Sequence, residues 1–166
     1  MKMNTHLTMT TVNIMHRLLV ALAALFYVSS AHAVLGGDLA SVEADRVHMS
    51  VKQAARQVPS LTASYTVYEI TLPSGTMIRQ YVSTAGGVVF AVAWSGPFIP
   101  DLQQLMGSHF NTMITRQAGK VQAGHRFISQ QHSDLVVESG GHPRSFTGRA
   151  YLPQALPAGL AVQDIR

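Results

Sequence analysis

The chain has 166 residues, carries 12 lysines and arginines against 8 acidic residues, and contains no cysteine. Without cysteine, neither disulfides nor a lipid-anchoring cysteine are available, so a folded domain has to be held by its core. The formal net charge is +4, but Lys2 and Arg17 lie within the first 33 residues, which lowers the net charge of the remainder to +2. No basic run or aromatic-basic stripe is present, so we expect no nucleic acid partner.

Residues 1–33 have the organisation of a secretory signal peptide. Arg17 precedes an apolar run from Leu18 to Val28, and small and polar residues then lead to an A-x-A motif ending at Ala33. This pattern predicts cleavage near Ala33, a location in the periplasm or outside the cell, and no membrane insertion afterwards. An uncleaved anchor is the alternative, but the apolar run is little more than half of the about 20 residues that cross a bilayer.

Residues 34–166 are expected to form a single exported domain, because this length is ordinary for one domain and sufficient for a core. Translation from Met15 instead of Met1 would give a more compact signal and the same exported chain. Near the start of this domain, Ser41 is predicted to cap a short helix.

The segment 65–94 predicts an antiparallel meander. Its residues 73–75, PSG, have the composition of a three-residue hairpin loop. In the register that this loop sets, Glu69 lies directly opposite Arg79, which predicts a cross-strand ion pair. The apolar run VVFAVAW that follows is typical of a central strand covered on both faces.

The segment after this strand is interpreted as a structural corner. Stop and start signals for a strand and a helix gather there, at Trp94, Gly96, Pro97, Pro100 and Asp101. Apolar residues then recur at helical spacing, which predicts one main helix from about residue 100 to residue 114. A solvent-open cleft lined by Trp94 and Phe98 would contradict the structural interpretation.

A second hairpin and a tail complete the predicted fold. The stretches LVVES and SFTGRAYL flank residues 140–144, GGHPR, which are expected to form the hairpin loop. The proline-containing tail is expected to run extended along the surface, where Leu160, Val162 and Ile165 could add a short edge strand. The fold class is therefore α+β: an antiparallel β-meander packed against one main helix, with a second hairpin and an extended C-terminal tail.

The GGHPR stretch is the candidate ligand-binding or anion-binding site, formed by Gly140, Gly141, His142 and Arg144. Glycines in a turn expose successive backbone N–H groups that cradle an anion, and an arginine adds a charge-assisted contact. The alternative is an ordinary glycine-rich turn with an exposed arginine.

Metal or hydrolytic chemistry would depend on the histidines of the second half. His125, His132 and His142 could converge on a metal if the strands there pair, although the close ligand spacing of zinc sites is absent. The G-x-S-x-G pattern is also absent, and the closeness of Ser139 and Asp134 to His142 along the chain does not make a catalytic triad. No cofactor and no catalytic residue are therefore predicted.

Five stretches taken together, SVEADR, YTVYEITLPSGTMIRQYVS, VFAVAWSGPFIPDLQQLMG, DLVVESGGHPRSFTGRAYLP and LPAGLAVQDIR, resemble a proteobacterial family of exported proteins known only as a domain of unknown function. The resemblance covers nearly all of the chain after the signal and implies a small exported protein without assigned catalytic residues. Residues 65–94 also bear a faint likeness to secreted domains of the PepSY type, which implies binding or inhibition rather than catalysis.

The leading hypothesis is thus a non-catalytic envelope or secreted binding module, with an unknown envelope or secreted protein or a small ligand as its partner. A periplasmic metal-dependent or hydrolytic enzyme is the alternative, and a structural accessory subunit of a surface assembly is a third hypothesis. A stoichiometric metal that shifts the melting temperature would favour the enzyme. Co-purification with a larger partner would favour the subunit.

Overall fold

The structure is a computed structural model that describes residues 35–58, 63–117 and 128–166. These residues belong to one compact unit, Ala31–Arg166. Its helices are α2 (Leu39–His48), α3 (Leu102–Met106) and α4 (Ser108–Gln117), with the 3-10 turns η1 (Pro153–Ala155) and η2 (Val162–Asp164). Its strands are β1 (Arg56–Val58), β2 (Tyr65–Thr71), β3 (Met77–Ser83), β4 (Val89–Gly96), β5 (Ile128–Gln131), β6 (Val136–His142) and β7 (Ser145–Tyr151).

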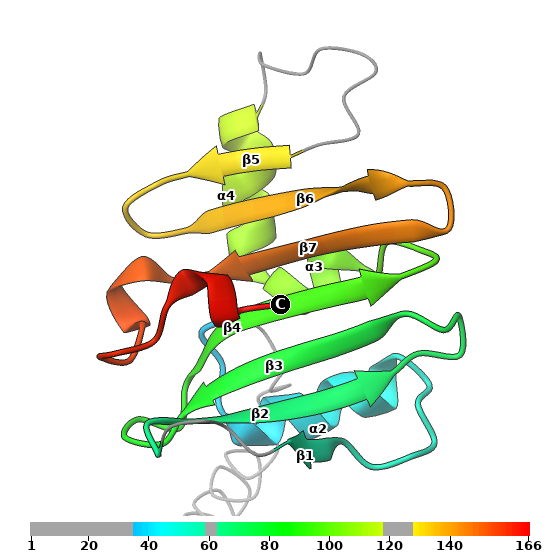
Figure 1. Cartoon of the computed structure of the whole chain (residues 1–166), viewed down its shortest axis with the longest axis horizontal. Helices are drawn as coiled ribbons and strands as arrows, with labels where there is room; N and C mark the ends of the chain where they lie inside the picture. Colours follow the sequence, from blue (N-terminus) through cyan, green and yellow to red (C-terminus); the bar gives the residue numbers. More distant parts are fainter. Residues whose placement is uncertain (1–34, 59–62, 118–127) are drawn as a thin grey trace, which may run out of the picture. The chain divides into compact units, whose positions relative to one another are not determined.

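The strands form one antiparallel sheet in the order β1-β2-β3-β4-β7-β6-β5 (Figure 1). This arrangement confirms the α+β fold class and the meander of β2, β3 and β4. The pairing of β2 with β3 has the predicted register, with Glu69 opposite Arg79 and Ile70 opposite Ile78. The strand β4 occupies the middle of the sheet, as its continuous apolar run predicts.

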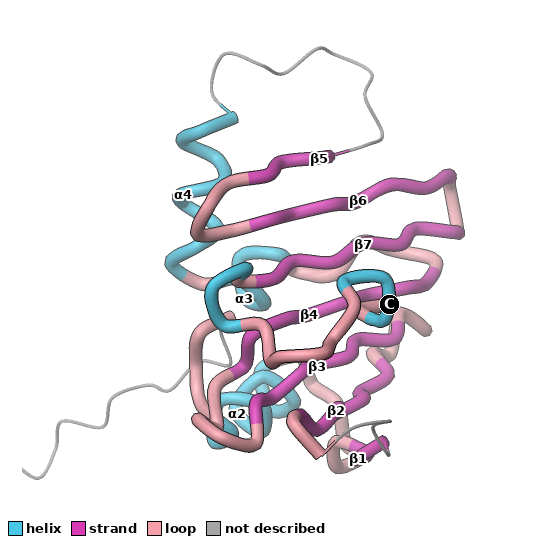
Figure 2. The backbone as a smooth tube through the Cα atoms, turned by 60° about the vertical axis from the view of Figure 1, so that its left-hand side comes forward, coloured by secondary structure: helices cyan, strands magenta, loops and turns pink. Residues whose placement is uncertain are grey.

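Each face of the sheet has its own cover. The helices lie behind the sheet in Figure 1 and the C-terminal segment, residues 152–166, lies in front of it, an arrangement that Figure 2 shows from another side. We call these the helix face and the tail face. The helix-face core includes Val42, Ile78, Val92, Trp94, Leu105, Met106, Met113 and Val137. The tail-face core includes Tyr65, Tyr81, Phe90, Ala91, Ala93, Val136, Tyr151 and Ile165.

The helix α2 begins one turn earlier than predicted. Asp38 is the N-cap and its Oδ1 accepts a hydrogen bond from the Ser41 backbone N–H at 3.1 Å, so the expectation that Ser41 caps the helix is wrong. Farther along the helix, the fully buried Asp45 accepts hydrogen bonds from Gln80 Nε2 at 2.7 Å and Gln104 Nε2 at 2.6 Å. A buried carboxylate needs such partners, and these bonds tie α2 to β3 and to α3.

The predicted main helix is divided in two. Gly107, at φ 50°, ends α3, and α4 starts at the next residue. Pro100 is buried and lies outside the helix, while Asp101 is the N-cap and accepts from the Gln104 N–H at 3.0 Å. The glycine breaks the helix because it adopts a backbone conformation that a residue with a β-carbon rarely takes.

The tail does not add an edge strand. Residues 152–166 instead form η1 and η2 and cover part of the tail face, where Ile165 is 1% exposed. The described edges of the sheet are the short strands β1 and β5, which the sequence did not predict. The prolines that indicated an extended path fit a turn-rich segment equally well, since proline also starts short helical turns.

Candidate functional site

One row of residues crosses all seven strands on the tail face and carries most of its charge. In register order the row consists of Arg56, Glu69, Arg79, Ala93, Arg149, Glu138 and Ser129. We call it the charged row. Because successive members lie directly across neighbouring strands, their side chains stand side by side on one face.

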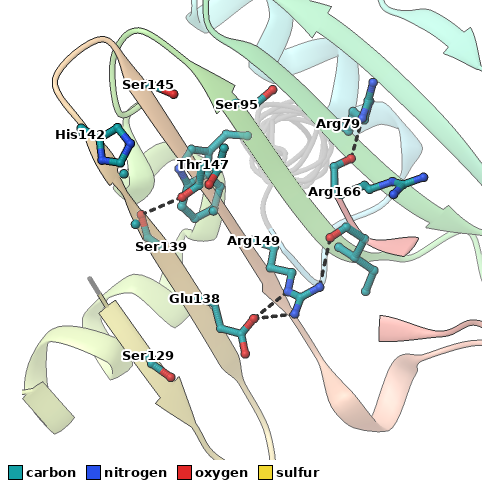
Figure 3. Close-up of a pocket in the computed structure, with 15 residues that line it drawn as sticks. Arg79, Ser95, Ser129, Glu138, Ser139, His142, Ser145, Thr147, Arg149 and Arg166 are labelled. Carbon is teal, nitrogen blue, oxygen red and sulfur yellow. Dashed lines mark hydrogen bonds and ion pairs between the residues drawn. The ribbon is translucent and has the colours of Figure 1, made fainter. Parts of the chain in front are cut away.

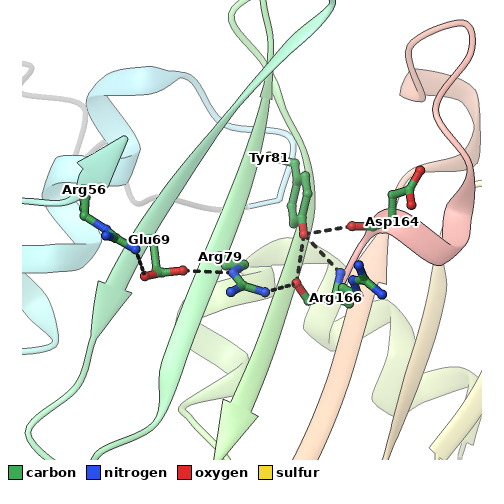
Figure 4. Close-up of polar contacts among 6 residues, drawn as sticks. All are labelled: Arg56, Glu69, Arg79, Tyr81, Asp164 and Arg166. Atoms are coloured by element: carbon green, nitrogen blue, oxygen red, sulfur yellow. Dashed lines mark hydrogen bonds and ion pairs between the residues drawn. The ribbon is translucent and has the colours of Figure 1, made fainter. Parts of the chain in front are cut away.

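Glu69 holds the first half of the charged row. Its carboxylate accepts from Arg79 Nε at 3.0 Å and from Arg56 Nη2 at 3.0 Å, so the predicted ion pair between Glu69 and Arg79 is present and has a second arginine (Figure 4). Burial raises the pKa of Glu69, but the hydrogen bonds and charges of Arg79 and Arg56 outweigh burial and leave this pKa below its ordinary value. The glutamate is therefore ionised at neutral pH.

Arg149 holds the second half. Its Nε and Nη2 contact Glu138 Oε2 at 2.8 and 2.6 Å, and its Nη1 donates to the main-chain oxygen of Val162 at 2.7 Å. Arg79 makes the corresponding contact on the other side, donating from Nη1 to the main-chain oxygen of Arg166 at 2.7 Å. The two arginines on either side of Ala93 thus fix the C-terminal segment on the sheet.

Tyr81 adds a third anchor for this segment. Its hydroxyl accepts from the Arg166 N–H at 3.0 Å and lies 3.0 Å from the Arg166 oxygen and 3.2 Å from the Asp164 oxygen (Figure 4). Burial raises the pKa of Tyr81, so the hydroxyl is protonated and able to donate. With these anchors, Ile165 seals the apolar half of the tail face next to Ala93.

The other half of the tail face is open and forms a groove of about 830 Å³ over β4, β7 and β6 (Figure 3). Ser95 and Thr147, which are register partners, lie in its middle. Ser145 lies farther along β7, and Ser129 lies beside Glu138 on β5. Arg149 with Glu138 and the end of the C-terminal segment form its border with the sealed half. A volume of about 300–1,000 Å³ is usual for small-molecule sites.

The predicted anion site lies partly in this groove. Gly140, Gly141 and His142 line it, whereas Arg144 does not. The predicted loop is also shorter than expected: the glycines belong to β6 and are paired with β7, and only Pro143 and Arg144 form the turn. Gly140, which occupies a tail-face position, therefore gives the groove a low floor, and the two glycines do not form a turn with successive free N–H groups. Gly141 in particular has to be glycine, since a β-carbon there would lie 2.2 Å from the Ser145 oxygen.

Trp94 lies beneath the groove. It is 2% exposed and belongs to the helix-face core, and its ring packs against Gly148, where a β-carbon would lie 2.3 Å from Cζ2. Its Nε1 is buried without a hydrogen-bond partner among the described residues. A solvent-open cleft lined by both Trp94 and Phe98 would contradict the structural corner. Trp94 does line the groove, whereas Phe98 is exposed and does not line it. Beside the strand end, Gly96 contacts Thr76, whose hydroxyl donates to the Phe98 oxygen at 2.8 Å.

The candidate metal ligands are not brought together in the described part of the chain. His125 lies outside the described residues, His142 is exposed on β6, and His132 follows β5. No group of three or more metal-ligating side chains occurs in residues 35–58, 63–117 and 128–166. Ser139 and His142 occupy positions of opposite parity on β6, so their side chains project from opposite faces of the sheet, and the Ser139 hydroxyl contacts the Thr147 oxygen at 3.5 Å.

Sequence reasoning missed Ser95, Thr147 and the pair of Arg149 with Glu138. Exposed hydroxyls on strands carry no distinctive local signal, and the pair forms only when β6 and β7 are placed in register.

None of the described helices has the length and apolar character needed to span a membrane. No curated protein and no solved structure matches the chain. Residues 31–165 match a protein family described as a protein of unknown function, DUF2844. Since the match covers most of the sequence, the chain belongs to the DUF2844 family.

Proposed function

We propose that this protein is an exported, non-catalytic binding module and that it holds a small polar ligand in the groove over β4, β7 and β6. The observation that carries the proposal is the division of the tail face. Its apolar half is sealed by the C-terminal segment, while the half that carries Ser95 and Thr147 is open and offers a concave surface of suitable size.

The rigidity of the groove supports a binding role. Its border is fixed by the contacts of Arg149 with Glu138 and Val162, and its floor consists of paired strands in the middle of the sheet. Side chains that are already held in place lose little conformational freedom when a ligand binds, which favours affinity. The charged groups at the border are engaged with each other, an arrangement that suits positioning better than proton transfer.

The experiment is a binding screen read by two-dimensional amide NMR, with a groove-filling variant. Ligands from a mixture of small polar compounds should shift the amides of Ser95, Thr147 and Gly140. The variant Thr147→Phe should abolish the shifts, because the ring would occupy the groove from an exposed strand position where aromatic residues are tolerated.

Thr71→Phe is the matched control, since Thr71 is an exposed strand threonine that does not line the groove. It should leave binding unchanged. A compound that binds both variants equally well, or no shift of any groove amide, would refute the proposed site.

Export is a separate part of the proposal, motivated by the apolar run before Ala33. Mass spectrometry of the protein recovered from the envelope or the medium should give a chain that starts at Val34. A chain recovered with residues 1–33 intact in the cytoplasm would refute export.

A further inference from the structure

The charged side chains that border the groove are engaged within the fold. Arg149 uses Nε and Nη2 on Glu138 and Nη1 on the Val162 oxygen, and Arg79 uses Nε on Glu69 and Nη1 on the main chain of the C-terminal segment. Oxyanions are normally held by a guanidinium or ammonium group whose donors are free. Arg149 is the arginine closest to the middle of the groove, and four of its five N–H donors are engaged, since its Nη1 also lies 3.4 Å from the Ile165 oxygen. It therefore cannot hold an oxyanion with a bidentate pair of free donors.

Arg166 does not replace it. In Figure 3 its side chain extends away from the side of the groove where Ser95 and Thr147 lie. Arg144 lies at the hairpin turn and does not line the groove. The engaged donors of Arg149 and the positions of Arg166 and Arg144 therefore disfavour an anion between Ser95 and Thr147.

The groove instead offers neutral donors and acceptors side by side. The hydroxyls of Ser95 and Thr147 are exposed register partners, and in the described part of the chain neither makes a side-chain hydrogen bond. Glu138 accepts both Arg149 contacts on Oε2, which leaves Oε1 as an acceptor at the groove border. Serine and threonine hydroxyls both donate and accept, whereas a carboxylate oxygen only accepts.

Such a set is complementary to a ligand whose own groups donate and accept at neighbouring positions. Building on the proposed binding role, we infer that the groove takes a neutral, polyhydroxylated ligand of the saccharide class. Its hydroxyls would pair with Ser95 and Thr147, and one of them would donate to Glu138 Oε1 in a charge-assisted hydrogen bond. The bare backbone of Gly140, a tail-face position in the floor, gives a sugar ring room to lie close to the sheet.

Amide NMR titrations of the full exported chain test the inference with two sets of probes. Glucose, N-acetylglucosamine, maltose and a mixed oligosaccharide library form one set; inorganic phosphate and citrate at constant ionic strength form the other. At least one saccharide should shift the amides of Ser95, Thr147 and Gly140, and the oxyanions should not.

Variants that remove single hydroxyls give the second measurement. Thr147→Val and Ser95→Ala should each weaken saccharide binding about tenfold, the loss expected for one hydrogen bond. The matched control Thr71→Val makes the same change at an exposed strand threonine outside the groove and should bind as tightly as the parent protein.

The outcomes separate the two proposals. If the oxyanions bind in the groove and the saccharides do not, the saccharide inference is overturned and the binding module stands. If no probe and no compound of the screen shifts a groove amide, both are overturned. Saccharide binding that survives Thr147→Val and Ser95→Ala unchanged would also overturn the inference, because the ligand would then lie elsewhere.

Discussion

Replacing Gly148 by alanine should destabilise the fold, because β7 has no room for a β-carbon at this position. The added atom would lie 2.3 Å from Trp94 Cζ2, 2.5 Å from Trp94 Cε2 and 2.8 Å from the main-chain oxygen of Glu138. Neither neighbour can yield easily. Trp94 is 2% exposed within the helix-face core, and the Glu138 oxygen belongs to a paired strand.

The expected cost follows from this confinement. Overpacking of a core costs about 1–3 kcal/mol, and collision with a buried ring on one side and backbone on the other indicates the upper part of the range, about 2–3 kcal/mol. Unfolding entropy is about 2.1 cal/mol/K per residue, or about 0.3 kcal/mol/K for a domain of this length, so the melting temperature should fall by about 7–10 °C.

Urea unfolding followed by the fluorescence of Trp94, the only tryptophan, measures this loss and also reports any displacement of the ring. Gly86→Ala is the control, since the nearest atom to its β-carbon would be Val88 Cγ2 at an ordinary 3.7 Å. It should change stability by no more than about 0.5 kcal/mol. A second test uses circular dichroism: in a Trp94→Leu background the alanine should cost clearly less, as coupling between neighbours requires. Equal stability of Gly148→Ala and the parent protein would refute the packing argument.

Three further substitutions test the anchors of the fold. Glu69→Gln should cost about 1.5–3 kcal/mol at neutral pH. The pKa of Glu69 is lowered in the folded state, so the ionised carboxylate stabilises the fold above the ordinary glutamate pKa, and this stabilisation is lost as the pH falls through the folded-state pKa. The free energy of unfolding of Glu69→Gln in urea should therefore depend less on acid pH than that of the parent protein. An unchanged pH profile would contradict this. Asp45→Asn should cost about 1–3 kcal/mol in urea unfolding, since the new amide nitrogen would face the side-chain amide of Gln80 or of Gln104. An unchanged free energy of unfolding would show that these hydrogen bonds add nothing to stability. Tyr81→Phe should speed hydrogen exchange of the Arg166 amide without affecting the sheet, and protection equal to that of the parent would rule out the hydroxyl as an anchor.

The parts of the fold that are determined by residues close together in the sequence were predictable. The loop at residues 73–75 sets the register of β2 and β3, and that register places Glu69 opposite Arg79. Likewise the continuous apolar run of β4 was sufficient to predict a central strand. In each case the signal lies within a short segment, so the rest of the chain does not have to be placed first.

Helix ends and the tail were less predictable. Gly107 lies within a run of helically spaced apolar residues, and periodicity alone does not reveal that it breaks the helix. Ser41 and Asp38 are both good caps, and Asp38 takes the role because the helix starts immediately after it. The tail is shaped by contacts with Arg79 and Arg149, which lie far away in the sequence.

The groove was predictable in part, because some of the residues that form it follow a pattern within one hairpin. Alternate residues of β7 on the tail face are Tyr151, Arg149, Thr147 and Ser145, and those of β6 are Val136, Glu138, Gly140 and His142. From the sealed half of the tail face to its open half, both strands therefore change from apolar to charged and then to small or polar side chains. A face that is apolar at one end requires a cover there, and its polar end can remain in contact with solvent. The sequence of the second hairpin thus indicates which half of the face stays open. Only the pairing of β7 with β4 shows that Ser95 extends this polar half into the middle of the sheet, where a ligand would meet both strands.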